Sequence, residues 1–183
     1  YYLYELTMNG RAQTGLVGCA SIDEYLNDGI KKHENTKPEK EKDRIRHVDV
    51  CSAHTGPIFL AYRRQESLAK LQEQVKKEKP LYAFVSEDGI GHGVWKIEEE
   101  TRIGEIYEIL KSVPELYIAD GHHRAASAVK TGLKRRKEAG EYTGEEEFNY
   151  FLAVLFPDQE LMILDYNRFV HDMNGYTCLL YTS

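Results

Sequence analysis

Apolar and polar residues alternate along several short stretches of the chain, as they do in β-strands that have one face in a core. The pattern predicts strands over residues 1–8 and 14–20, joined at Asn9-Gly10, a dipeptide that favours tight hairpins. Further strands are predicted at residues 57–62, 81–85, 92–97, 116–119 and 148–156, and a last strand at 161–166 that forms a hairpin with the strand before it.

Apolar residues at helical spacing predict helices between these strands. The predicted helices cover residues 65–77, 103–110 and 125–137, the last with Ala126, Val129 and Leu133 facing inward. Ser21 and Glu24 have the spacing of a capping box, which predicts a short helix up to residue 29. The stretch 31–46 is dense in charge and is typical of a solvated loop or a frayed helix. Strands and helices mixed in this way indicate an α+β fold.

The length of 183 residues suits one domain with a real core and is short for two. We expect residues 1–175 to form a single α+β domain. Residues 176–183 continue no pattern and are expected to be a non-native tail. The chain opens at Tyr1, inside a predicted strand and without an initiator Met, so we expect a fragment whose native N- and C-terminal parts are missing.

The formal net charge of −6 gives no broad attraction for nucleic acid, so nucleic acid is not an expected partner. Any phosphate site has to be local, built from a few cations and backbone N–H groups. The three widely spaced cysteines form no disulfide framework or zinc motif and suit a reducing cytoplasm. No apolar run has the length needed to cross a membrane.

The strongest candidate site is the segment from Asp120 to Arg124, where a predicted strand passes through a glycine directly into a helix. The first N–H groups of a helix lack partners within it and attract anions. Gly121 lets a phosphate approach the backbone, and Arg124 can bind it with two parallel hydrogen bonds. His122 and His123 add donors, and Asp120 is well placed as the N-cap residue.

Two other interpretations of this turn stay open. Adjacent histidines suggest a metal site, although neighbouring helix residues point about 100° apart and do not easily share one ion. A capped helix with two exposed histidines is the plainest alternative. We favour the phosphate-binding interpretation over both.

A second candidate lies in the charged stretch, at His33, Glu34, Thr36 and Arg44. Phosphoryl transfer needs a base for the acceptor hydroxyl and cations for the transferred group. Glu34 is the candidate base, and the other three residues are candidates for orienting substrate or phosphate. Spacing alone does not establish that this stretch meets the Asp120 turn, and a charged surface loop is the simpler interpretation.

A third candidate, the glycine-rich stretch 88–93, suggests a phosphate loop, but no Gly-Lys-Ser/Thr follows it. A glycine-rich hairpin turn explains it better.

Together these motifs resemble the DUF1015 family of proteins of unknown function. The resemblance rests on Tyr117 to Arg124, His33-Glu34, Thr36, Asp43-Arg44, residues 153–157 and Tyr166-Asn167-Arg168. It covers most of the chain, from about residue 1 to residue 175, and family members are longer than this chain.

The Asp-Gly-His-His-Arg box is also similar to the phosphate-binding box of the ParB and sulfiredoxin-like superfamily. That resemblance implies a mixed sheet with flanking helices and a strand-to-helix phosphate-binding turn. One branch contains free serine kinases, which phosphorylate L-serine with a nucleotide and Mg²⁺. The expected cofactor is therefore Mg²⁺ with ATP or ADP, and the expected partners are a nucleotide and a small-molecule substrate.

Carried over residue by residue, the resemblance implies roles for the two candidate segments. Glu34 would activate the serine hydroxyl, with Asp120 and His122 also catalytic. The nucleotide phosphates would bind to Gly121, His122, His123 and Arg124, and substrate would bind to His33, Thr36 and Arg44.

Two alternative functions are kept. The first is a nucleotide-binding switch of the ParB type that uses CTP or ATP, although the acidic charge argues against DNA binding by this segment. The second is a metal-dependent hydrolase that uses Asp120, His122 and His123. Sulfiredoxin chemistry needs a cysteine in the box, and this chain has none there.

Overall fold

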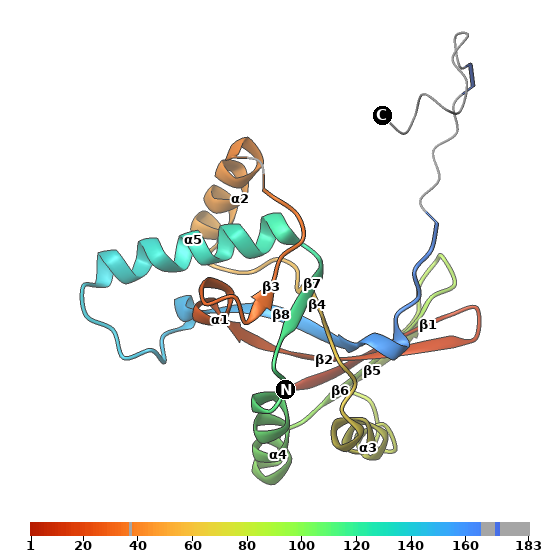
Figure 1. Ribbon diagram of the computed structural model, residues 1–183. Helices are drawn as coiled ribbons and strands as arrows, with labels where there is room; N and C mark the ends of the chain where they lie inside the picture. The colour runs from red at the N-terminus through yellow and green to blue at the C-terminus, as the bar shows by residue number, and fades with distance from the viewer. Residues whose placement is uncertain (37, 166–170, 173–183) are drawn as a thin grey trace.

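The computed structural model describes residues 1–36, 38–165 and 171–172. Within these ranges, eight strands form one mixed sheet flanked by five α-helices (Figure 1). The strands are β1 (Tyr2–Met8), β2 (Arg11–Ser21), β3 (Ile30–Lys31), β4 (Ile58–Tyr62), β5 (Tyr82–Val85), β6 (Gly91–Lys96), β7 (Leu116–Asp120) and β8 (Tyr150–Pro157). The helices are α1 (Ile22–Leu26), α2 (Pro38–Cys51), α3 (Glu66–Val75), α4 (Glu100–Lys111) and α5 (His122–Ala139). The mixed α+β architecture that the sequence predicted is confirmed.

One half of the sheet is an antiparallel array in the order β5-β6-β1-β2. The predicted β1–β2 hairpin is confirmed, and both Asn9 and Gly10 have the positive φ that a tight hairpin turn requires. The glycine-rich stretch joins β5 to β6, where the Ser86 N–H donates to the Ile90 carbonyl. It is therefore a hairpin turn, as expected, and it lies at the far edge of the sheet from β7.

The other half of the sheet has the order β3-β7-β4-β8, and β8 joins it to β2. Strand β8 pairs in parallel with β4 on one side and antiparallel with β2 on the other. The predicted final hairpin is therefore wrong over residues 161–165, which form no strand and leave Ile163 98% exposed. Both edges of β8 are already paired, so no edge is free for a returning strand. Residue 166 and the predicted tail at 176–183 lie outside the described residues.

The helices lie on two sides of the sheet: α2 and α5 appear above the strands in Figure 1, and α3 and α4 below them. Helix α5 buries Ala125, Ala128 and Val129 in the core. A Cβ at Gly132 would lie 2.4 Å from the Phe148 carbonyl oxygen, so α5 approaches this backbone closely. Because residue 132 faces inward, Leu133 turns outward and is 40% exposed, contrary to the prediction.

The charged stretch of the sequence forms a regular helix, α2, which extends to Cys51. Of the two predicted alternatives for residues 31–46, the loop is confirmed at residues 32–36 and a helix at residues 38–46. The helix packs against α5 (Figure 1). Its charged side chains meet cations of α5. No helix among the described residues is both long and apolar enough to span a membrane.

Candidate functional site

The Asp120 turn joins β7 to α5 through a left-handed glycine. Gly121 has φ 98° and ψ 28°, a conformation that other residues adopt only at a cost, and it is the N-cap residue of α5. The prediction that Asp120 is the N-cap was wrong. Asp120 is still the last residue of β7, and its carboxylate accepts a hydrogen bond from Arg124 at 2.8 Å instead of capping the helix. The free N–H groups of α5 are thus left without a side-chain cap.

Charged and polar groups at this turn are open to a ligand. The Asp120 side chain is 73% exposed, and the Arg124 side chain is also exposed. Within the described residues, Arg124 Nε and His123 Nδ1 are shielded from solvent and have no hydrogen-bond partner. Buried polar atoms without a partner are uncommon in folded proteins, and a bound ligand is one way to satisfy them.

The first flank of the turn is the segment that follows β3. Strand β3 pairs in parallel with the start of β7, which carries the next residues toward the N-terminus of α5. There the His33 N–H donates to His122 Nε2 at 3.4 Å. The two imidazole rings meet edge to face, with their centroids 4.3 Å apart. Glu34 Oε2 lies 3.8 Å from His122 Nδ1. The charged stretch therefore does meet the Asp120 turn, which spacing alone could not establish.

His122 is nearly fully buried, with 5% of its side chain exposed. Burial lowers its pKa, and the neighbouring His33 adds to this effect, so the ring is neutral at pH 7. Since Nε2 accepts from the His33 N–H, the proton of the neutral ring is assigned to Nδ1, which faces Glu34. Glu34 remains 58% exposed, so its carboxylate is accessible from solvent.

The second flank is formed by α2 and by the residues that precede β4. The N-terminal end of β4 lies beside the end of β7, because Phe59 pairs with Asp120. A small cavity of about 30 Å³ opens here, enough for about two water molecules. Four cationic or titratable side chains share its lining: Arg44, His47, His54 and Arg124. The remaining lining residues are Val48, Thr55, Gly56, Ile58 and Ser127.

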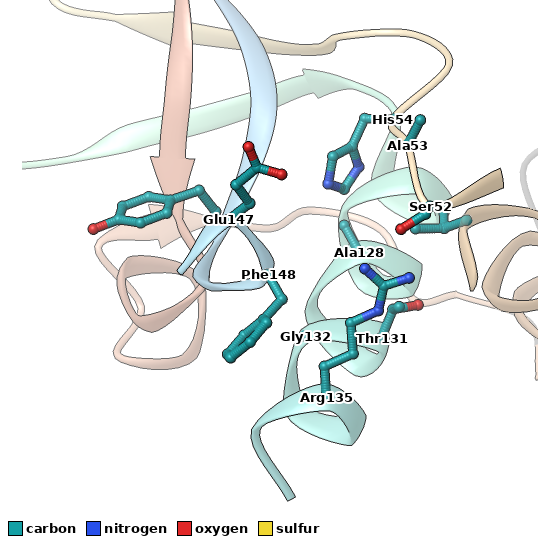
Figure 2. A pocket seen from close by; sticks show the side chains of 11 residues that line it. Ser52, Ala53, His54, Ala128, Thr131, Gly132, Arg135, Glu147 and Phe148 are labelled. Atoms are coloured by element: carbon teal, nitrogen blue, oxygen red, sulfur yellow. The ribbon is translucent and has the colours of Figure 1, made fainter. Parts of the chain in front are cut away.

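A second cavity of about 70 Å³ continues along α5 and shares Val48 and His54 with the first. Figure 2 shows the His54 ring and the Arg135 guanidinium directed toward one another across it, with Glu147 on a third side. Burial lowers the pKa of His54, and the charge of Arg135 acts in the same direction. The two cavities are therefore neighbours beside α5, and Arg124 lines the first of them.

Thr36 and Arg44 have different surroundings from those of Glu34. The Thr36 hydroxyl donates to Glu41, a buried carboxylate on α2, which Lys130 of α5 also binds. Arg44 lines the cavity beside Arg124. The structure thus gathers His33, Glu34, Thr36 and Arg44 around the N-terminal half of α5, with Thr36 directed to Glu41.

Sequence reasoning missed Glu41, Lys130, His47 and His54. Glu41 and Lys130 carry no local signal, because Glu41 lies in a run of charge, Lys130 is a single charge among small and apolar residues, and the two meet only through the packing of α2 on α5. A signal for His54 existed: His54-Thr55-Gly56 directly precedes the strand predicted at residues 57–62. Polar residues next to a strand end are well placed to line a site when that strand pairs beside the turn.

The histidines of the turn have separate surroundings. The Nε2 atom of His122 is taken up by the His33 N–H, and Glu41 is among the charges near His123. Among the described residues, no group of three or more His, Cys, Asp or Glu side chains could hold a metal ion. The hypothesis of a metal-dependent hydrolase at Asp120, His122 and His123 therefore gains no support from the described residues.

The fold and site define the chain as an α+β protein with a mixed sheet and with charged groups gathered at one strand-to-helix turn. A model of the family described as "Protein of unknown function (DUF1015)" matches residues 1–179. The chain belongs to this family, as the motifs predicted. No curated protein and no solved structure matches the chain.

Proposed function

We propose that the protein is a nucleotide-dependent phosphotransferase that acts on a small hydroxy compound, with L-serine as the preferred candidate. One observation carries the proposal: an accessible carboxylate and a cationic cavity flank the same helix N-terminus. Glu34 lies on one side of the turn, and Arg44 and Arg124 line the cavity on the other. A base for a hydroxyl and cations for a phosphoryl group are the two parts that phosphoryl transfer needs.

The likeness of the Asp120–Arg124 box to that of the free serine kinases supports the same assignment. In the ParB and sulfiredoxin-like superfamily this box binds phosphates, which agrees with the uncapped N–H groups of α5 and with the unpartnered Arg124 Nε. The mixed sheet is compatible with that superfamily. The acceptor and the nucleotide are then expected on opposite flanks of the turn.

In the proposed reaction, the acceptor hydroxyl oxygen forms a new bond to the terminal phosphorus of the nucleotide. The bond between that phosphorus and its bridging oxygen breaks, and the bridging oxygen leaves with the shortened nucleotide. Glu34 accepts the hydroxyl proton. The Nδ1–H of neutral His122 faces the Glu34 carboxylate at 3.8 Å, while Arg124 and Arg44 bind the phosphate oxygens.

Oxygen ligands suitable for Mg²⁺ are present at the turn. Mg²⁺ is usually held by one or two carboxylates together with substrate phosphates, and the exposed Asp120 carboxylate fits this donor set. Asp120 is the residue that would hold the ion. When bound with the nucleotide, Mg²⁺ would neutralise charge on the phosphate oxygens.

Product analysis tests the proposal. The chain is incubated with Mg²⁺ and either ATP or ADP, with L-serine, homoserine, threonine or glycerol as acceptor, and phosphorus NMR is used to detect a phosphate ester. Glu34→Gln removes the base, and we expect kcat to fall at least about 100-fold while the nucleotide KM changes little. Glu108→Gln, an exposed site on α4, is the matched control and should match the wild type.

If no acceptor gives a phosphate ester, the phosphotransferase assignment is wrong. Nucleotide binding without such a product, lost in Arg124→Ala, would instead favour the switch of the ParB type. If none of ATP, ADP and CTP binds, both the kinase and the switch are excluded.

A further inference from the structure

Helix α2 is attached to α5 mainly by ion pairs. Among the α2 side chains that the structure describes, Glu41 alone is buried. It pairs with Lys130 near one end of the helix, and Asp49 pairs with Lys134 at 2.6 Å and with Arg135 at 3.6 Å near the other end. A helix held in this way has little apolar burial to fix its position, so the ion pairs at each end determine where that end sits.

Glu41 is the group that connects α2 to two other segments. Its carboxylate accepts hydrogen bonds from the Thr36 hydroxyl and from the Lys130 ammonium, and only 6% of the residue is exposed. These two donors lower the pKa of Glu41, against the effect of burial, so the carboxylate is charged at pH 7. A buried charge with both partners in place is costly to disturb.

Among the residues that the structure describes, the segment that carries Glu34 has few other attachments. Residues 33–35 are exposed, and at their N-terminal side β3 has only two residue pairs with β7. The hydrogen bond from the His33 N–H to His122 is long, at 3.4 Å. The Thr36 hydroxyl, bound to Glu41, is therefore the anchor at the C-terminal side of Glu34.

We propose that Glu41 is a positioning residue for the reaction. Through its bond to Thr36 it fixes Glu34 near the N-terminus of α5. Through α2 it fixes Arg44 beside the cavity that Arg44 lines together with Arg124. The inference rests on the proposed phosphotransferase function. Arg44 follows Glu41 by three residues, about one helical turn, so a single attachment to Lys130 sets both groups. The carboxylate does not itself touch substrate.

Two readouts on Glu41→Gln test this role. Amide hydrogen exchange measures the order of residues 33–36 without reference to activity, and kinetics measure the consequence. We expect exchange at residues 33–36 to speed up roughly tenfold and kcat to fall roughly tenfold or more, since small misplacements of reacting groups are costly. The KM for the acceptor should change by less than about threefold, because its binding groups remain.

Asp49→Asn is the matched control, because it removes the ion pairs at the other end of the same helix interface. It should leave exchange at residues 33–36 and kcat at wild-type values. If Glu41→Gln does not fold, Thr36→Val removes only the hydroxyl and keeps the Glu41–Lys130 pair, and the same two effects are expected from it.

Each outcome decides between the hypotheses. If exchange at residues 33–36 is unchanged in the folded variant, or is raised equally in Asp49→Asn, the positioning role is wrong whatever the activity. If exchange rises only in the Glu41 or Thr36 variant but the wild type forms no phosphate ester, the attachment stands and the phosphotransferase function fails. If exchange rises and kcat stays at the wild-type value, Glu41 orders the segment without serving catalysis, and the proposal is also overturned.

Discussion

Gly121 is a residue whose conformation and surroundings both require glycine. Its φ of +98° is strained for a residue with a Cβ, and that Cβ would lie 2.9 Å from Arg124 Nη2. We expect Gly121→Ala to lower the free energy of unfolding by about 1–2 kcal/mol and to displace the Arg124 side chain. Urea denaturation measures the first effect, and nucleotide titration the second.

Gly104 on α4 provides the opposite case, because a Cβ there would meet nothing within 4 Å and the site is helical. Gly104→Ala should raise the free energy of unfolding by about 0.5–1 kcal/mol. Equal effects of the two substitutions would show that the left-handed turn is not strained by a side chain.

The buried ring of His122 makes stability depend on pH. Its pKa in the folded state lies below the unfolded value of about 6.5, so the unfolded chain binds the proton more readily. The stabilisation is complete above about pH 6.5 and is lost as the pH falls toward the folded pKa. The pKa of His54 is lowered in the same direction by burial, so both rings contribute.

Between pH 7.5 and 5, we therefore expect the free energy of unfolding to fall less in His122→Gln than in the wild type. In the double variant that also carries His54→Gln, the fall should be smaller still. Urea denaturation at several pH values measures this. Parallel pH profiles for the wild type and both variants would contradict it.

At the residue scale, the sequence identified one flank of the candidate site better than the other. The charged stretch and the Asp120 box could be selected as candidates because their residue types suit phosphate chemistry. The cap position was wrong because Asp120 can serve either as a cap or as a partner of Arg124, and only the backbone conformation decides. Glu41 could not be foreseen, because its burial depends on Lys130, 89 residues away.

At the element scale, Arg136 connects three elements at the far end of α5. Its guanidinium donates to both carboxylate oxygens of Asp23 in α1, at 2.7 and 2.8 Å, and to the Asn149 side chain at 2.6 Å. Asn149 is buried in the 3₁₀-turn Glu147–Asn149. A lysine cannot make these three bonds together, because it lacks the planar fork of donors.

We expect Arg136→Lys to lower the free energy of unfolding by about 1–2 kcal/mol, most of it from the buried Asn149 acceptor. Lys137→Arg, on the exposed face of the same turn, is the control and should change stability by less than about 0.5 kcal/mol. Urea denaturation of both variants checks this, and a neutral Arg136→Lys would mean that the connection adds nothing to stability.

Elements with a strong local pattern were predicted well. The β1–β2 hairpin, α3 and α4 each have a turn signal or an apolar stripe within their own residues. The order of helix α2 was underestimated. Its charged residues suggest exposure to solvent, and only the structure shows that cations of α5 lie opposite them. The prediction of the last hairpin was wrong because the edge of β8 that it needed is paired with β4, a strand far away in the sequence.

At the scale of the whole molecule, the sheet consists of two halves that meet at one strand. Strands β5, β6, β1 and β2 form one half, and β3, β7, β4 and β8 the other. Among the described strands, β8 alone joins the halves, since it pairs with β4 on one side and with β2 on the other. No local pattern in the sequence could reveal this, because β4 and β8 are separated by more than 80 residues.

The position of β8 in the sequence and in the sheet determines the order in which the two halves of the sheet can form during synthesis on the ribosome. Strands β1, β2, β5 and β6 all lie within the first 96 residues, so their antiparallel array can assemble while synthesis continues. The half that carries the Asp120 turn has no strand pairing to that array until residues 150–157 have left the exit tunnel. The antiparallel array can therefore form early in synthesis, and the half that carries the Asp120 turn is joined to it later, through β8.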